Sequence, residues 1–293
     1  MFPQFVCIGA QKAGTSWLYH NLKDHPQIWL PPVKEIKYFN KADRRPWLLT
    51  LLSSQRGRTI LHGKVKRALR HVKKGQHISW YLRYFFLPRN DGWYASLFSP
   101  REGQIAGDIS PGYDIVTQNI VTHIHSLMPN LKIVYLLRNP IDRMWSHAAM
   151  RFRKWGDQGL HTIDEERIKS FLDNETVIRR TQYLKTLQAW EQVYPKEQIF
   201  VAFFEQLKQN PRQLLKDIHH FLEVDASYIP DSVEQKVGAG QYSQIPAHWA
   251  RYLAERHHEQ LTVLHQRFNN SSTANWLEFA KQHLSTEWAL END

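Results

Sequence analysis

Apolar residues in this chain gather into short continuous runs, and longer amphipathic stretches separate them. Three runs are rich in β-branched and aromatic residues, which is typical of buried strands: 4–8 (QFVCI), 132–137 (KIVYLL) and 198–203 (QIFVAF). A fourth and weaker run covers 104–109 (QIAGDI). Helical patterns lie between them, at 15–25, 119–128, 140–155, 177–194 and 211–224. Buried strands that alternate with helices predict an α/β fold, with a parallel sheet flanked by helices on both faces.

We expect one domain over residues 1–293, because α/β domains of this length are ordinary. The stretch from about 40 to 100 has no strand pattern and is predicted to be a basic helical insertion. Between Asp43 and Asp91 there is no acidic residue, and twelve lysines and arginines contribute to the net charge of +10. Such a stretch either attracts an anionic partner or only keeps the protein soluble, and both interpretations stay open.

The composition narrows the class of protein further. No apolar stretch approaches the roughly 20 residues that span a bilayer, so we expect no transmembrane segment. The first strand begins too early for a secretory leader, and the single cysteine, Cys7, excludes a disulfide within the chain. These features favour a cytoplasmic location. The 16 histidines show no spacing typical of metal ligands, so no metal site is predicted.

The first strand runs into GAQKAGTS (9–16), which is close to a phosphate-binding loop. Gly9 and Gly14 have the required spacing, but the lysine, Lys12, precedes the second glycine. A glycine turn between a strand and a helix directs backbone N–H groups and the helix dipole at one anion. Thr15 and Ser16 add hydroxyl groups. A tight turn needs glycine whatever it binds, so the pattern by itself is weak evidence.

A second candidate element, LLRNPIDRMWSHA, also follows a strand and enters a helix. Arg138 leaves the strand, and Ser146 lies eight residues later. Together a guanidinium and a hydroxyl can bind a second phosphate. Alone, Arg138 could be a structural cap and Ser146 a residue on a helix face. Combined with the first loop, they indicate a ligand with two separated anionic ends.

These two elements, K-A-G-T-S-W-L and R-N-P-x-D-R-x-x-S-H, resemble the sulfotransferases that use 3′-phosphoadenosine 5′-phosphosulfate (PAPS). The stretches KEIKYF, DGWYASLF and GDISPGY are also similar, and they favour a soluble bacterial-type member near the heparan-sulfate branch rather than the phenol and steroid branch. The resemblance implies a P-loop-like sheet and donor contacts from these residues: Lys12, Ala13, Gly14, Thr15, Ser16, Trp17, Arg138, Ser146 and Tyr183. In KVGAG (236–240) it implies that Lys236, Gly238 and Gly240 belong to a loop and helix, about 230–270, that cover the nucleotide.

The resemblance also implies a mechanism without a metal. Lys12 would neutralise the charge that develops on the leaving phosphate of PAPS, which leaves as adenosine 3′,5′-bisphosphate (PAP). Glu35, in KEIKYF, would be the base that deprotonates the acceptor, and Lys34 and Lys37 beside it favour its ionised form. Two positions depart from the family. Ile109 replaces the histidine of the phenol and steroid branch, and Lys37 replaces a histidine of the heparan-sulfate branch.

The predicted activity is therefore transfer of a sulfuryl group to a hydroxyl or amine. We expect a small-molecule or glycan acceptor and no nucleic acid partner; the acceptor and the oligomeric state stay open. One alternative is a P-loop nucleotide or small-molecule kinase, which would need ATP and magnesium. Another is a non-catalytic module that keeps the fold and binds polyanions through its basic segment.

Overall fold

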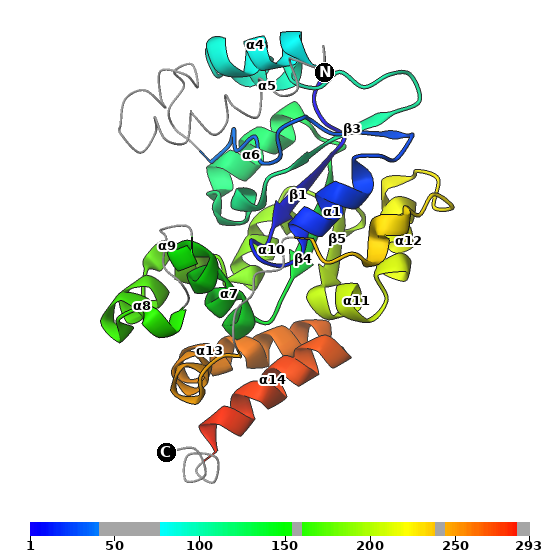
Figure 1. Ribbon diagram of the computed structural model, residues 1–293. Helices are drawn as coiled ribbons and strands as arrows, with labels where there is room; N and C mark the ends of the chain where they lie inside the picture. Colours follow the sequence, from blue (N-terminus) through cyan, green and yellow to red (C-terminus); the bar gives the residue numbers. More distant parts are fainter. Residues whose placement is uncertain (41–76, 154–159, 238–243, 286–293) are drawn as a thin grey trace.

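The computed structural model describes residues 1–40, 77–153, 160–237 and 244–285. Its centre is a parallel sheet with the strand order β2-β3-β1-β4-β5 (Figure 1). In these ranges the strands are β1 (Phe5–Gly9), β2 (Ile28–Trp29), β3 (Ile105–Ile109), β4 (Lys132–Leu137) and β5 (Ile199–Phe203). The four predicted strands and the predicted α/β class are confirmed. The sequence pattern missed β2, because two residues at a sheet edge show no periodicity.

Helices surround this sheet. Those in the described ranges are α1 (Thr15–Leu22), α4 (Ile78–Phe86), α5 (Asp91–Ser96), α6 (Gln118–Leu127), α7 (Pro140–Arg153), α8 (Glu165–Leu172), α9 (Glu175–Arg179), α10 (Tyr183–Glu191), α11 (Phe204–Gln209), α12 (Pro211–Leu222), α13 (Ala247–Phe268) and α14 (Ser271–Leu284). Helices α1 and α12 cover one face, and α6 and α10 cover the other (Figure 1). The chain moves one way along the sheet from β1 to β2 and the other way from β2 through β3 and β4 to β5. Right-handed crossovers therefore place α1 on the opposite face from α6 and α10.

Strand β1 is the centre of the sheet and of the core. It pairs with β3 on one side and with β4 on the other, and Phe5, Val6, Cys7 and Ile8 are each at most 1% exposed. A strand buried on both faces must be apolar throughout, which is why its sequence shows no alternation. Because all pairings are parallel, β1, β3 and β4 end at the same edge. That edge positions the candidate site.

The prediction of one continuous helix over 177–194 is wrong, because this segment forms two helices, α9 and α10. Between them, the N–H and the hydroxyl of Thr181 both donate to the carbonyl of Ile178, at 2.9 and 2.5 Å. A continuous helix would use that carbonyl for residue 182. Arg180 caps the end of α9, and its Nη1 lies 2.6 Å from Oδ1 of Asp114.

Two other predicted segments are only partly described. Residues 41–76, the larger part of the basic insertion, lie outside the described residues, and the rest of that segment contains α4 and α5. Near the C-terminus, α13 is followed by α14, which the sequence analysis did not predict, and the two helices pack side by side (Figure 1). None of the described helices is long and apolar enough to cross a membrane.

Helix α12 buries a histidine that makes stability sensitive to acid. His219 is fully buried against the ring of His25, with 4.6 Å between ring centroids, and neither of its nitrogens has a hydrogen-bond partner among the described residues. Burial, followed by the charge of His25, lowers the pKa of His219 to about 4. A histidine in the unfolded chain keeps a pKa of about 6.5. The unfolded state therefore binds more protons between these two values.

We predict that this histidine removes about 3 kcal/mol from the free energy of unfolding as the pH falls from about 6.5 to about 4. The measurement is urea unfolding at several pH values for the native protein and for His219→Leu. The free energy of unfolding of the native protein should fall relative to that of His219→Leu as the pH decreases, because leucine carries no proton. His220→Leu, at the exposed neighbour, is the control. A pH-independent difference for His219→Leu would contradict the prediction.

Candidate active site

The glycine loop between β1 and α1 has a backbone shape that depends on its sequence. Gly14 caps α1 with a φ of 98°, and Lys12 also has a positive φ, 75°. A Cβ atom on Gly14 would lie 2.7 Å from the side chain of Leu207. Thr15 and Ser16 form the first turn of α1, which contains no acidic residue. The helix dipole at this end is therefore free to attract an anion.

Arg138 lies beside this loop, as the sequence predicts. It follows β4, and its Nη1 donates to the carbonyl oxygen of Lys12 at 3.1 Å. Its guanidinium packs over the ring of Phe204, 4.6 Å from the centroid, and the residue is only 5% exposed. The parallel pairing of β1 with β4 produces this contact, because it brings the two strand ends together. The two predicted anion-binding elements therefore form one region.

The helix after β4 contributes a buried hydroxyl. Ser146, on α7, is 1% exposed, and its Oγ has no hydrogen-bond partner among the described residues. Such a group is costly to leave unsatisfied, so it fits a site that is completed by a ligand. Tyr183 is placed differently. It is fully buried, and its hydroxyl donates to the carbonyl of Arg138 at 2.8 Å, so in this structure it supports the arginine backbone.

Positive charge converges on this part of α7. Burial is the main cause that lowers the pKa of His147, next to Ser146, to about 2, and nearby cations contribute to the same shift: Arg143, Arg180, Lys12 and Arg151. Lys12 is thus one of the cations close to the helix that carries Ser146. A field of this sign favours a polyanionic ligand.

The predicted residues near the C-terminus are placed in part. Trp17 of α1 donates from Nε1 to the carbonyl of Val233 at 2.7 Å, which ties the segment around η4 (Asp231–Glu234) to the loop helix. Lys236 follows on the surface, whereas Gly238 and Gly240 lie outside the described residues. Ala13, within the loop, is buried. The roles of these residues toward a nucleotide stay predictions.

Glu35 lies in a segment that is attached to the end of β3. The N–H of Glu35 donates to the carbonyl of Ile109 at 3.2 Å, and the N–H of Lys37 donates to Oγ of Ser110 at 3.2 Å. Glu35 and Lys37 both have positive φ values, 66° and 58°. Residues other than glycine rarely adopt this conformation, and it is common at functional sites.

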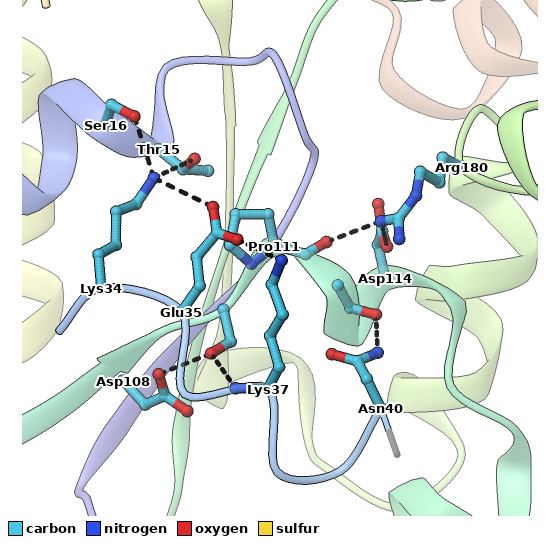
Figure 2. Close-up of polar contacts among 12 residues, drawn as sticks. Thr15, Ser16, Lys34, Glu35, Lys37, Asn40, Asp108, Pro111, Asp114 and Arg180 are labelled. Atoms are coloured by element: carbon cyan, nitrogen blue, oxygen red, sulfur yellow. Dashed lines mark hydrogen bonds and ion pairs between the residues drawn. The ribbon is translucent and has the colours of Figure 1, made fainter. Parts of the chain in front are cut away.

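Figure 2 shows the carboxylate of Glu35 between two ammonium groups. Nζ of Lys37 lies 2.6 Å from Oε2, and Nζ of Lys34 lies 3.7 Å from Oε1. Lys34 also donates to the hydroxyls of Thr15 and Ser16, at 3.2 and 3.0 Å (Figure 2). The predicted base is thus joined to the predicted anion loop through Lys34. The sequence analysis missed this role of Lys34. The available signal was its position directly before Glu35, which brings its side chain close to the proposed base.

Two buried carboxylates, Asp108 and Asp114, lie beneath the surface next to the segments that form the candidate site. Asp108, in β3, accepts hydrogen bonds from Ser110 at 2.7 Å, Tyr113 at 2.9 Å and Tyr94 at 3.0 Å, and burial raises its pKa to about 6. Asp114, in η1 (Pro111–Ile115), pairs with Arg180, and a Cβ atom on Gly9 of the loop would lie 3.0 Å from its side chain. Burial raises the pKa of Asp114, while Arg180 opposes that shift. Through Ser110, Asp108 is linked to the backbone of Lys37, whereas Asp114 holds Arg180.

The fold and the loop define a P-loop-like α/β protein. The chain belongs to the sulfotransferase family, because the sulfotransferase domain model matches residues 2–289. Membership of this family implies PAPS as the donor. Among the described residues no cluster of three or more histidine, cysteine or acidic side chains could hold a metal ion.

Two human proteins are similar in sequence. Bifunctional heparan sulfate N-deacetylase/N-sulfotransferase 2 is 23% identical over 236 residues, which cover 76% of this chain and 22% of that protein. Heparan sulfate glucosamine 3-O-sulfotransferase 6 is 27% identical over 227 residues, which cover 75% of this chain and 52% of that protein. The chain therefore spans about half the length of the 3-O-sulfotransferase and about a fifth of the length of the bifunctional protein. A sulfotransferase crystal structure from Alicyclobacillus acidocaldarius shares the fold, with a TM-score of 0.64 and 22% identity over 94% of this chain and 99% of that one.

We predict that Gly14→Ala weakens binding of PAP at least tenfold, because the loop must leave its left-handed conformation or displace Leu207. It should also cost about 1–2 kcal/mol of stability. Gly103→Ala is the matched control, since Gly103 has a φ of 77° and no atom within 4 Å of the new Cβ. Calorimetry and urea unfolding measure the two effects. Unchanged PAP binding in Gly14→Ala would show that the loop shape is not required.

Proposed function

We propose that the protein transfers a sulfuryl group from PAPS to a hydroxyl or amine of a glycan or another small acceptor. The observation that carries this proposal is the contact between the backbone of Lys12 and the guanidinium of Arg138, at 3.1 Å. It joins two anion-binding elements into one region that suits a ligand with two phosphate ends. The buried hydroxyl of Ser146 fits the same ligand.

The loop residues would hold the 5′ end of the donor, and Arg138 with Ser146 would hold its 3′-phosphate. When bound, PAPS supplies an activated sulfuryl group. Transfer breaks the bond between sulfur and the bridging phosphate oxygen and forms a bond from sulfur to the acceptor oxygen or nitrogen. Lys12 stabilises the charge that the departing phosphate gains. Glu35 takes the proton that the acceptor loses.

The relatives favour a carbohydrate acceptor, because both human proteins carry heparan sulfate in their names. The open surface of Lys37, whose side chain is 40% exposed, supports an acceptor with an anionic group near the reacting atom. A cytoplasmic location belongs to the same proposal and is compatible with the buried thiol of Cys7, whose pKa burial raises to about 12.

The other two candidate functions have less support. A P-loop kinase needs a lysine directly after the second glycine, and this chain has Thr15 there. The polyanion-binding alternative depends on the basic segment, of which residues 41–76 lie outside the described residues. It also leaves the arrangement of Glu35, Lys34 and Lys37 without a role.

We predict that Lys12→Ala lowers kcat by a factor of about 100 or more, because an electrostatic contact to the leaving oxygen acts mainly in the transition state. Labelled PAPS with a panel of glycan and phenolic acceptors gives the rate. Calorimetry should show that native protein and variant both bind PAP and that neither binds ATP–Mg. Full turnover in Lys12→Ala would remove Lys12 from the mechanism, and ATP–Mg binding without PAP binding would favour the kinase.

We also predict that Glu35→Gln lowers kcat by a factor of about 100 or more, because the amide cannot accept the acceptor's proton. The backbone contact of Glu35 with Ile109 should keep the segment in place, so the melting temperature should change little. Glu205→Gln is a control, since this partly buried carboxylate bonds to Trp276, away from Glu35. An unchanged kcat in Glu35→Gln would exclude Glu35 as the base.

A further inference from the structure

Lys34 connects two groups that the proposed reaction uses separately. Its ammonium lies 3.0 Å from Oγ of Ser16, 3.2 Å from Oγ1 of Thr15 and 3.7 Å from the carboxylate of Glu35. Its side chain is 19% exposed. Both hydroxyls belong to the first turn of α1, where the dipole favours an anion. An ammonium fixed there lies at the mouth of the anion loop.

The surroundings of Lys34 compensate its positive charge only in part. Burial lowers its pKa, and Glu35 is the neighbour that most strongly opposes this shift. The two hydroxyls are neutral. A phosphate that enters the loop would bring more charge to this ammonium than Glu35 does, so it would compete with Glu35 for Lys34.

Glu35 has a second cation that the donor does not share. Lys37 is held at 2.6 Å from the other carboxylate oxygen, and its backbone bonds to Ser110. When Lys34 turns toward a phosphate, Glu35 loses one ammonium neighbour. A carboxylate with fewer cationic neighbours accepts a proton more readily.

We propose that Lys34 is a second cation of the anion loop, which binds the 5′ end of the donor and thereby releases Glu35 for proton transfer. This inference rests on the proposed function. It assigns to Lys34 a contact with the donor and a coupling between donor binding and the base. Lys12 and Lys34 would then approach the same end of the donor from two different segments.

The test compares two nucleotides by calorimetry. PAP carries phosphates at both ends, whereas adenosine 3′-monophosphate lacks the 5′-phosphate. Lys34→Met should weaken PAP binding by about tenfold or more and leave binding of the monophosphate unchanged, because a charged hydrogen bond to the 5′ end is lost. Lys34→Arg should restore part of the affinity. Lys23→Met, at a surface lysine paired with Asp24, is the control and should alter neither affinity.

A double-mutant cycle tests the coupling. Glu35→Gln should tighten PAP binding several-fold, because Lys34 no longer has to leave a carboxylate, and binding couplings are reciprocal. The gain should vanish in the Lys34→Met background and persist in the Lys37→Gln background. A gain that survives in Lys34→Met would contradict the role of Lys34.

The outcomes separate this inference from the function it rests on. If the native protein binds neither nucleotide, the proposed function fails and the inference fails with it. If the native protein binds PAP and Lys34→Met weakens both nucleotides equally, or neither, the function stands and the inference is wrong. An unchanged PAP affinity in Glu35→Gln would likewise overturn the coupling alone.

Discussion

The site depends on the parallel pairing of β1 with β4. This pairing places the glycine loop after β1 beside Arg138 after β4, and the arginine then donates to the backbone of Lys12 at 3.1 Å. The ring of Phe204 lies against the guanidinium of Arg138, and the hydroxyl of Tyr183 donates to the carbonyl of Arg138. A long cationic side chain is thus fixed at low cost in rotamer entropy when a ligand arrives.

The segment that carries Glu35 is organised by a different strand. Asp108 in β3 is buried and collects three hydroxyl donors, one of which, from Ser110, also accepts the N–H of Lys37. Through this network the core of the protein determines a left-handed backbone at Glu35 and Lys37. Such conformations cost roughly 1–3 kcal/mol each and persist only where neighbouring structure holds them. Here these conformations place the carboxylate of Glu35 between the ammonium groups of Lys34 and Lys37.

The two halves of the site have different constraints. The proposed donor side is built from backbone, a helix start and an arginine, features that suit a ligand with two phosphates. On the proposed acceptor side, Ile109 and Lys37 stand where the resemblance to the family's branches implies other residues. Lys37 is also more exposed than Lys34. The family resemblance is therefore more informative about the donor than about the acceptor.

The sequence by itself determined four strands, their parallel arrangement and the positions of the two candidate anion-binding elements, because each of these depends on local periodicity, glycine placement and short spacing. It could not determine the break between α9 and α10, the two-residue strand β2, or the contact of Lys34 with Thr15 and Ser16. These features depend on residues that are distant along the chain and meet only when the sheet has formed. Lys34 is 18 residues from Ser16, and β3 lies about 70 residues beyond Lys34. Only the tertiary structure brings these three segments to one edge.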